Sequence, residues 1–201
     1  AGPLHGFERA VDISVNGIGN TGVNPPDPCL AVGPNHVVQM LNGSGGAYFR
    51  ICDKSLATIG AAQTYMDNFL AAQLSYSGLG DPVVLYDALA DRWLISEFTS
   101  NNNNLIVAIS QTANPTGAWY VYSYTATNFP DYPKYGVWNN CYVVTSNENS
   151  PAIYALPRAS MLAGTTGTAV RFTVPAYATI GFQACTPVHF GGGDAPPAGA
   201  P

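Results

Sequence analysis

Few side chains of this chain could do acid–base or nucleophilic chemistry, and they are scattered. The three histidines are His5, His36 and His189. His36 stands at a turn into a strand, where hydrogen bonding is the more ordinary role. Ser44 lies in a glycine-rich hairpin and lacks the strand-to-helix turn that exposes a serine nucleophile. The sequence therefore predicts no catalytic residue and a protein that is not an enzyme.

The acidic side chains offer little more. The only glutamates are Glu8, Glu97 and Glu148, and a glycosidase would need two carboxylates flanking its bond. Glu97 and Glu148 occupy matching places at the ends of two expected strands. That equivalence favours a repeated surface position over an acid–base pair.

Three aspartates recur at similar intervals. Asp27, Asp81 and Asp131 stand 54 and 50 residues apart, each with a proline within two residues. Aspartate before a turn bonds its own backbone, so we expect a repeated turn role. A shared calcium or substrate ring is the alternative, although the chain has no EF-hand loop or nonapeptide calcium repeat. We expect no metal and no cofactor.

The four cysteines predict disulfides. Cys29, Cys52, Cys141 and Cys185 lack the CxxC spacing of zinc and redox sites. Two disulfides in an exported protein are expected, with all three pairings open. Proximity in sequence favours Cys29–Cys52 and Cys141–Cys185, and buried free thiols are the alternative.

Two kinds of surface site could involve glycans. Trp93, Trp119 and Trp138 would stack on carbohydrate if exposed, whereas packing between repeats would bury them. Asn42 begins the Asn-Gly-Ser sequon, on an expected hairpin, and is a candidate glycosylation site.

The aspartates belong to longer repeats. Each copy reads as Asp, Pro, a short apolar strand, a polar turn and a longer apolar strand, and a period of roughly 20–50 residues marks a repeat architecture. The second copy predicts strands at 83–86, 93–98, 105–110 and 119–124, and the third at 134–137, 142–147, 153–156 and 170–174. The first predicts strands at 36–42, 47–53 and 56–59, with helices expected at 61–74 and 159–163.

These elements define the expected organisation. Residues 1–26 are an extended leader with one strand at 11–15, residues 27–190 a single β-repeat domain, and residues 191–201 a Pro/Gly-rich tail. The units are 27–80, 81–130, 131–180 and a partial fourth at 181–190, whose strand is expected at 182–190. The fold class is all-β with minor helix: antiparallel four-stranded meanders repeated at about 50 residues, as in an incomplete β-propeller-like array.

Composition excludes several partners. Of 201 residues only 9% are charged, and the formal charge is −5. Seven scattered Lys and Arg residues make no basic face for nucleic acid or an anionic membrane surface. No apolar stretch approaches the ~20 residues of a membrane span, and no signal peptide precedes Ala1, which indicates a processed export signal or a fragment.

Several longer motifs resemble one family. The stretches PPDPCLAVGPNHVV, GDPVVLYDALADRWLISEF, VAISQTANPTGAWYVYSY, NFPDYPKYGVWNNCYVVTSN and IYALPRASMLAG together resemble exported bacterial proteins with multi-blade β-propeller-like ectodomains. The resemblance covers roughly residues 24–200. It implies an extracellular or cell-surface location and no defined biochemical activity.

The leading expectation is a non-enzymatic extracellular structural or adhesive protein. Closed propellers use about 4–8 blades, and three units with a fraction leave sheet edges exposed to partners. We therefore expect copies of the chain to assemble into a fibre or surface layer. The alternatives are a glycan- or protein-binding β-propeller module and a fragment of a secreted glycan-active enzyme.

Overall fold

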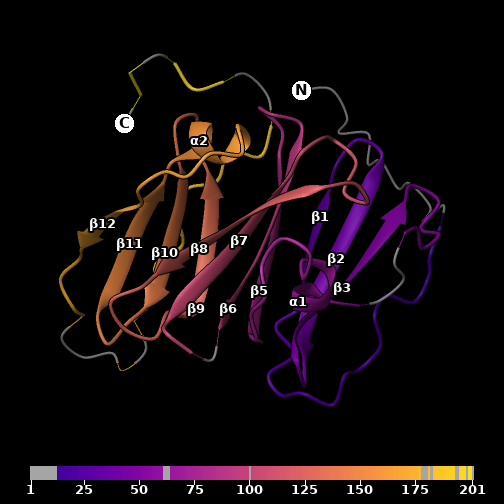
Figure 1. Cartoon of the computed structure of the whole chain (residues 1–201), viewed down its shortest axis with the longest axis horizontal. Coiled ribbons are helices and arrows are strands. Elements are labelled where there is room, and N and C mark those ends of the chain that lie inside the picture. The colour runs from indigo at the N-terminus through magenta and orange to yellow at the C-terminus, as the bar shows by residue number, and fades with distance from the viewer. Residues whose placement is uncertain are drawn as a thin grey trace, which may run out of the picture.

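The strands form three four-stranded antiparallel sheets, one from each expected unit (Figure 1). The computed structural model describes residues 13–60, 64–99, 101–177, 181, 183–192, 195–197 and 199–200. Within each sheet the strands are neighbours in chain order, so each sheet is a simple meander. The mostly-β class and the repeated four-stranded unit are confirmed.

We call these sheets 1, 2 and 3. Sheet 1 contains β1 (Cys29–Val32), β2 (His36–Gly43), β3 (Gly46–Asp53) and β4 (Thr64–Tyr65). Sheet 2 contains β5 (Gly78–Asp87), β6 (Arg92–Thr99), β7 (Asn104–Ser110) and β8 (Trp119–Thr125). Sheet 3 contains β9 (Asp131–Val137), β10 (Tyr142–Asn147), β11 (Pro151–Leu156) and β12 (Val170–Thr173).

The sheets stack face to face with sheet 2 in the middle (Figure 1). Successive side chains of a strand point to opposite faces, and β6 is apolar on both. Trp93 and Ile95 pack with sheet 1, whereas Leu94 packs with sheet 3. A sheet that is apolar on both faces has to be covered twice, and this requirement explains its central place.

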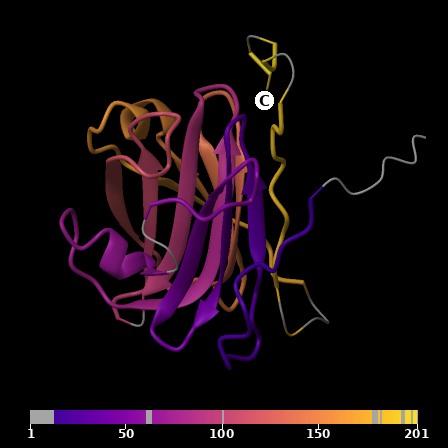
Figure 2. The ribbon, with the colours of Figure 1, turned by 90° about the vertical axis from the view of Figure 1, so that its right-hand side faces the viewer.

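The first strands of the three sheets lie side by side. The Cys29 thiol, on β1, contacts the Pro82 carbonyl of β5 at 3.3 Å. The Tyr132 N–H, on β9, donates to the Asp81 carboxylate of β5 at 3.1 Å. The segment 183–190 continues this series beside β9, where the Phe190 N–H donates to the Val137 carbonyl at 2.9 Å. Figure 2 shows the C-terminal segment running along this side of the molecule.

Both expected helices exist, and one is much shorter than expected. The helix expected at 159–163 is α2 (Arg158–Leu162). In place of a helix over 61–74 the structure has β4 and the single turn α1 (Met66–Phe69), with 61–63 outside the described residues. Apolar residues near helical spacing instead fold over the edge of sheet 1, where Met66 and Leu70 are buried. No helix among the described residues could cross a membrane.

Three other expected strands differ from the structure. Residues 56–59 contribute only the isolated bridge of Thr58 to Cys52, so β4 is the fourth strand of sheet 1. Of the leader strand at 11–15, residues 11 and 12 lie outside the described part, and 13–15 form no strand. Residue 182 is also outside it, and 183–190 run extended with no ladder. Residues 193, 194, 198 and 201 of the tail are not described either.

A buried ion pair joins sheet 2 to α2, the helix between β11 and β12 of sheet 3. The Arg158 guanidinium, at the start of α2, donates to both oxygens of Asp87 at 2.7 and 2.9 Å. The Tyr142 hydroxyl, on β10, donates to the same carboxylate at 2.8 Å. The Asp87 side chain is fully buried. Its charge is therefore compensated by groups from two other elements, which fixes how sheets 2 and 3 stack.

We predict that Arg158→Met lowers the free energy of unfolding by about 3–5 kcal/mol, because it leaves the Asp87 charge buried and unpaired. Urea unfolding followed by tryptophan fluorescence measures this loss. Arg92→Met is the matched control, because Arg92 donates only to turn carbonyls beside it. A loss below about 1 kcal/mol for Arg158→Met would contradict a structural role for the pair.

Candidate functional site

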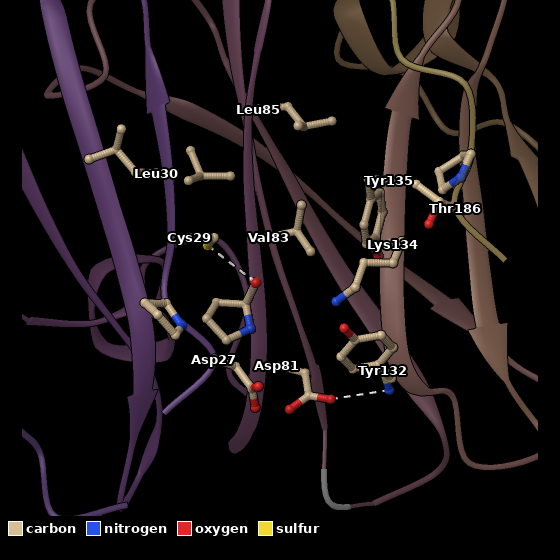
Figure 3. Close-up of a pocket in the computed structure, with 14 residues that line it drawn as sticks. Asp27, Cys29, Leu30, Asp81, Val83, Leu85, Tyr132, Lys134, Tyr135 and Thr186 are labelled. Atoms are coloured by element: carbon tan, nitrogen blue, oxygen red, sulfur yellow. Dashed lines mark hydrogen bonds between the residues drawn. The ribbon is translucent and has the colours of Figure 1, made fainter. Parts of the chain in front are cut away.

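A cavity of about 530 Å³ lies where the first strands of all three sheets meet (Figure 3). Asp27 and Cys29 line it from the start of sheet 1, Asp81 from β5 and Lys134 from β9. Thr186 and Pro187 complete it from the C-terminal segment. We call it the axial cavity. It brings together two of the three repeated aspartates.

The two aspartates share one amide. The Asn42 Nδ2 group, at the end of β2, donates to Asp27 at 2.7 Å, and its Oδ1 accepts the Asp81 N–H at 2.7 Å. The Oδ2 atom of the Asp81 carboxylate accepts a hydrogen bond from the Tyr132 N–H. Asp27, Asp81 and Tyr132 lie close together in Figure 3. This hydrogen-bonded cluster therefore connects all three sheets.

The third sheet is aligned one residue later than the aspartates indicate. Asp27, Asp81 and Tyr132 each precede a proline and each have positive φ, at 39°, 48° and 51°. Asp131 is the neighbour of the equivalent residue, and it accepts a bond from Asn147 at 3.4 Å. The aspartates also bond across strands rather than to their own backbone. The backbone conformation, rather than the aspartate, is thus the repeated feature.

Burial and the neighbouring Asp27 carboxyl together raise the pKa of Asp81 to about 6. The Lys134 ammonium sits 3.4 Å from the centre of the Tyr132 ring. Two carboxyls and one ammonium give the cavity hydrogen-bond acceptors and donors. Leu30, Val83 and Leu85 line it with apolar side chains (Figure 3). Such an arrangement can bind a small polar ligand without any chemical step.

A second hollow lies on the face of sheet 3 that points away from sheet 2. It encloses about 550 Å³. Val143, Ile153 and Phe172 line it from three adjacent strands, Trp138 from the turn after β9, and Pro187 from the C-terminal segment. We call it the sheet 3 groove. Its lining is mainly apolar, unlike that of the axial cavity.

The structure forms no disulfide among Cys29, Cys52, Cys141 and Cys185, which corrects the expected pairing. Cys29 is on β1 opposite Met40, and Cys52 is on β3 opposite Val37. With β2 between them their Cα atoms are about 10 Å apart or more, whereas a disulfide needs about 7 Å or less. Burial raises the pKa of the Cys29 thiol to about 11, so it is unreactive at neutral pH.

Cys141 and Cys185 both border the sheet 3 groove. The Cys185 carbonyl accepts a bond from Thr145, four residues along the chain from Cys141. Four extended residues span about 13 Å, which separates the two thiols. The proximity of two cysteines in sequence carries no information on their register across a sheet, and this is why the pairing was wrong.

Two of the three tryptophans are unavailable to a glycan. Trp93 and Trp119 are 1% and 3% exposed and pack between sheets 1 and 2. Their indole N–H groups donate to the carbonyls of Ala113 and Pro115. Trp138 differs, because it lines the sheet 3 groove and its buried indole N–H has no partner in the part of the chain that the structure describes.

Asn42 is a poor glycosylation site in this fold. Its side chain belongs to a residue that is only 6% exposed, and its Nδ2 group donates to Asp27 and to the Pro25 carbonyl. A glycan on that nitrogen would replace one of its two hydrogens, so at least one of these bonds would be lost. The sequon thus has the right letters and the wrong environment.

Glu97 and Glu148 are buried, which corrects their expected surface position. Glu97 accepts bonds from the Ala47 N–H at 2.8 Å and the Tyr76 hydroxyl at 2.9 Å, both outside its own sheet. Burial raises its pKa to about 8. Glu148 accepts bonds from Ser146 and Tyr154 within sheet 3. Both act in packing, and they do not face each other as an acid–base pair.

The histidines are not assembled into a site. His36 begins β2, whereas His189 accepts a bond from the Val137 N–H at its Nδ1 atom. His5 lies outside the described residues. Within the described part of the chain, no group of three or more His, Cys, Asp or Glu side chains could hold a metal ion.

The spacing of prolines is a sequence signal for the axial cavity that the aspartates alone do not contain. Prolines recur at intervals of 51 to 54 residues, at Pro28, Pro82, Pro133 and Pro187. Three of them line the axial cavity. Pro187, the last of the four, is the signal that groups Thr186 and Pro187 with the corresponding residues of the other units.

Comparison of the chain with protein-family models, curated proteins and solved structures finds no match.

We predict that Asp81→Asn makes stability less dependent on pH. A carboxyl whose pKa is raised from 3.8 to about 6 by folding favours its neutral form in the folded state. Its contribution is therefore fully present below pH ~4 and is lost as pH rises through ~6. Asparagine keeps a hydrogen-bonding side chain and carries no charge. Urea unfolding at pH 4 and pH 7.5 should show a gain for the variant at the higher pH only.

Asp53→Asn is the control with the opposite sign. Hydrogen bonds from Ser55 lower the pKa of Asp53, so this carboxylate stabilises the fold above its unfolded pKa and loses that effect as pH falls. The Asp53 variant should thus lose stability at pH 7.5. Equal pH profiles for both variants and the wild type would show that the Asp27–Asp81 cluster has no electrostatic role.

Proposed function

We propose that this chain is a non-enzymatic extracellular structural or adhesive protein that assembles from copies of itself, into a fibre or a surface layer. One observation carries the proposal. The outer face of sheet 3 is apolar and hollowed, and among the described residues only the segment 183–190 lies along it. Exposed apolar surface of this kind marks interaction sites.

We further propose that the three sheets are blades of a β-propeller-like array. The side-by-side arrangement of β1, β5 and β9 supports this, as do the evenly spaced prolines. The segment 183–190 takes the place of a fourth first strand beside β9. In such an array, each sheet is covered by the next, and sheet 3 has a face left over.

Strand edges supply further contacts. β12, the outermost strand of sheet 3, has four residues and pairs only with β11 among the described strands. Ile13 and Val15 of the leader are about half exposed. An unpaired edge is a template for another strand, and an apolar extended segment can supply one to a neighbouring molecule.

An extracellular location rests on composition and resemblance. Only 9% of residues are charged, against about 25% in average globular proteins. The motifs resemble those of exported bacterial β-propeller-like ectodomains. Neither feature requires a nucleophile, a cofactor or a metal.

We predict that the purified, folded chain forms oligomers whose size grows with concentration. Light scattering across a hundredfold concentration range and negative-stain electron microscopy measure this. Circular dichroism of the same samples separates assembly of folded chains from aggregation of unfolded ones. A folded chain that stays strictly monomeric at the highest concentration would rule out self-assembly.

The axial cavity favours a second candidate, a module that binds a glycan or another polar ligand. Its lining combines Asp81, Lys134 and Tyr132 with apolar residues. Carboxyl and ammonium groups bond hydroxyls, and tyrosine rings contact sugar faces.

We predict that a glycan bound in the axial cavity loses about tenfold or more of its affinity in Lys134→Met, which is one charge-assisted hydrogen bond. Lys54→Met, on an exposed turn of sheet 1, is the matched control and should bind as the wild type does. A glycan array identifies the ligand, and calorimetry measures the affinity. An array without hits, or equal affinities for both variants, would contradict this second candidate.

A further inference from the structure

The stack of sheets has two ends, and they differ. Three sheets have six faces, and four of these pack against one another in two apolar clusters. The remaining two are the outer face of sheet 1 and the outer face of sheet 3. What covers each of them decides how the molecule can meet a partner.

The leader covers part of the outer face of sheet 1. The Ile18 N–H of the leader donates to the Gln39 side chain at 2.9 Å. The Arg50 guanidinium, opposite Gln39 in the ladder, donates to the Asn16 carbonyl at 2.8 Å. Leader residues therefore occupy the part of this face that β2 and β3 form, whereas Leu30 and Val32 on β1 stay 58% and 53% exposed.

The outer face of sheet 3 is apolar across its strands β10, β11 and β12. Val143 lies opposite Ala155, and Ile153 lies opposite Phe172, so four apolar side chains form one continuous patch across β10, β11 and β12. Phe172 is 50% exposed. None of the described residues that line the sheet 3 groove is charged.

This face continues the pattern of the two interfaces already inside the molecule. In each of these, alternate residues of a sheet pack on alternate residues of the next. On sheet 3 the residues that alternate with Tyr142 and Val144 of the buried face are Val143 and Thr145 of the open one. The segment 183–190 already borders it, with Cys185 bonded to Thr145 and Gln183 to Asn147. The occupant that fits is therefore another sheet face, apolar and uncharged.

We propose that the occupant is the sheet 3 face of a second copy of this chain, paired face to face about a two-fold axis. This inference rests on the proposed self-assembly and names its first contact. The other outer face is partly covered by the leader and carries Arg50, whose charge would lose solvent in an apolar groove. The uncharged sheet 3 groove is thus more complementary to the same groove of a second copy than to the outer face of sheet 1. Because the groove is uncharged, the same patch can meet itself without repulsion.

Phe172→Asp tests the interface, because it places a charge in the patch at a half-exposed residue and leaves the buried clusters intact. We expect the dissociation constant of the dimer, measured by analytical ultracentrifugation, to rise about tenfold or more. Val32→Asp is the matched control. Val32 is a strand residue that is 53% exposed on sheet 1, so its substitution should leave the dissociation constant within about twofold. The milder Ile153→Thr, with circular dichroism of every variant, separates loss of pairing from loss of folding.

A mixing experiment tests the symmetry. Affinity-tagged Phe172→Asp chain is mixed with untagged wild-type chain and captured. Two-fold pairing predicts that the variant binds wild-type chain more weakly than tagged wild-type chain does, because every such pair contains the substituted face. Head-to-tail pairing predicts unweakened binding, since the sheet 3 face of the wild-type chain can still meet the sheet 1 end of the variant.

The outcomes separate the two proposals. If the wild type assembles and Phe172→Asp assembles equally well, or binds wild-type chain as tightly as tagged wild-type chain does, the two-fold interface is wrong while self-assembly stands. If the folded wild-type chain is monomeric at every concentration, self-assembly itself is wrong, and the interface with it.

Discussion

A β-sheet that is apolar on both faces has to be covered on both sides, and the rest of this structure depends on that constraint. β6 and β7 carry apolar side chains on both faces and are buried at almost every position, so neither face of sheet 2 can meet water. Sheet 1 and sheet 3 cover the two faces through separate apolar clusters. The outer face of sheet 3 is bordered among the described residues by the segment 183–190.

Buried polar groups make this stacking specific. Apolar faces alone tolerate sliding, because the hydrophobic effect has no direction. The Glu97 carboxylate of sheet 2 accepts a hydrogen bond from the Ala47 N–H of sheet 1. The Asp87 carboxylate of sheet 2 accepts hydrogen bonds from Tyr142 on β10 and Arg158 on α2. Each of these groups would be unpaired if a sheet shifted. Close approach supports this: a Cβ on Gly78 would lie 2.1 Å from the Glu97 carboxylate.

One hydrogen-bonded cluster links the three sheets near the start of their first strands, β1, β5 and β9. Asn42 bonds Asp27 and Asp81, and Asp81 bonds Tyr132. Asp27, Asp81 and Tyr132 each precede a proline and have positive φ. Asp tolerates this conformation better than Tyr does. Because burial and the nearby Asp27 carboxyl raise the pKa of Asp81 to about 6, the stability of the cluster depends on whether Asp81 is protonated. The axial cavity is therefore a pH-sensitive contact between the sheets as well as a candidate binding site.

The strands, their order and the period of the units could be predicted from the sequence alone. The reason is that the alternation of apolar residues and the turn residues between strands are local properties. All four strands of the second and third units were predictable in this way. The roles of individual side chains depend on the tertiary structure. Glu97 and Asn42 look like surface residues in sequence, and the stacking of sheets buries them. Cys29 and Cys52 are near in sequence, and the register across β2 separates them. Burial and register depend on residues about fifty positions away, and no local pattern contains that information.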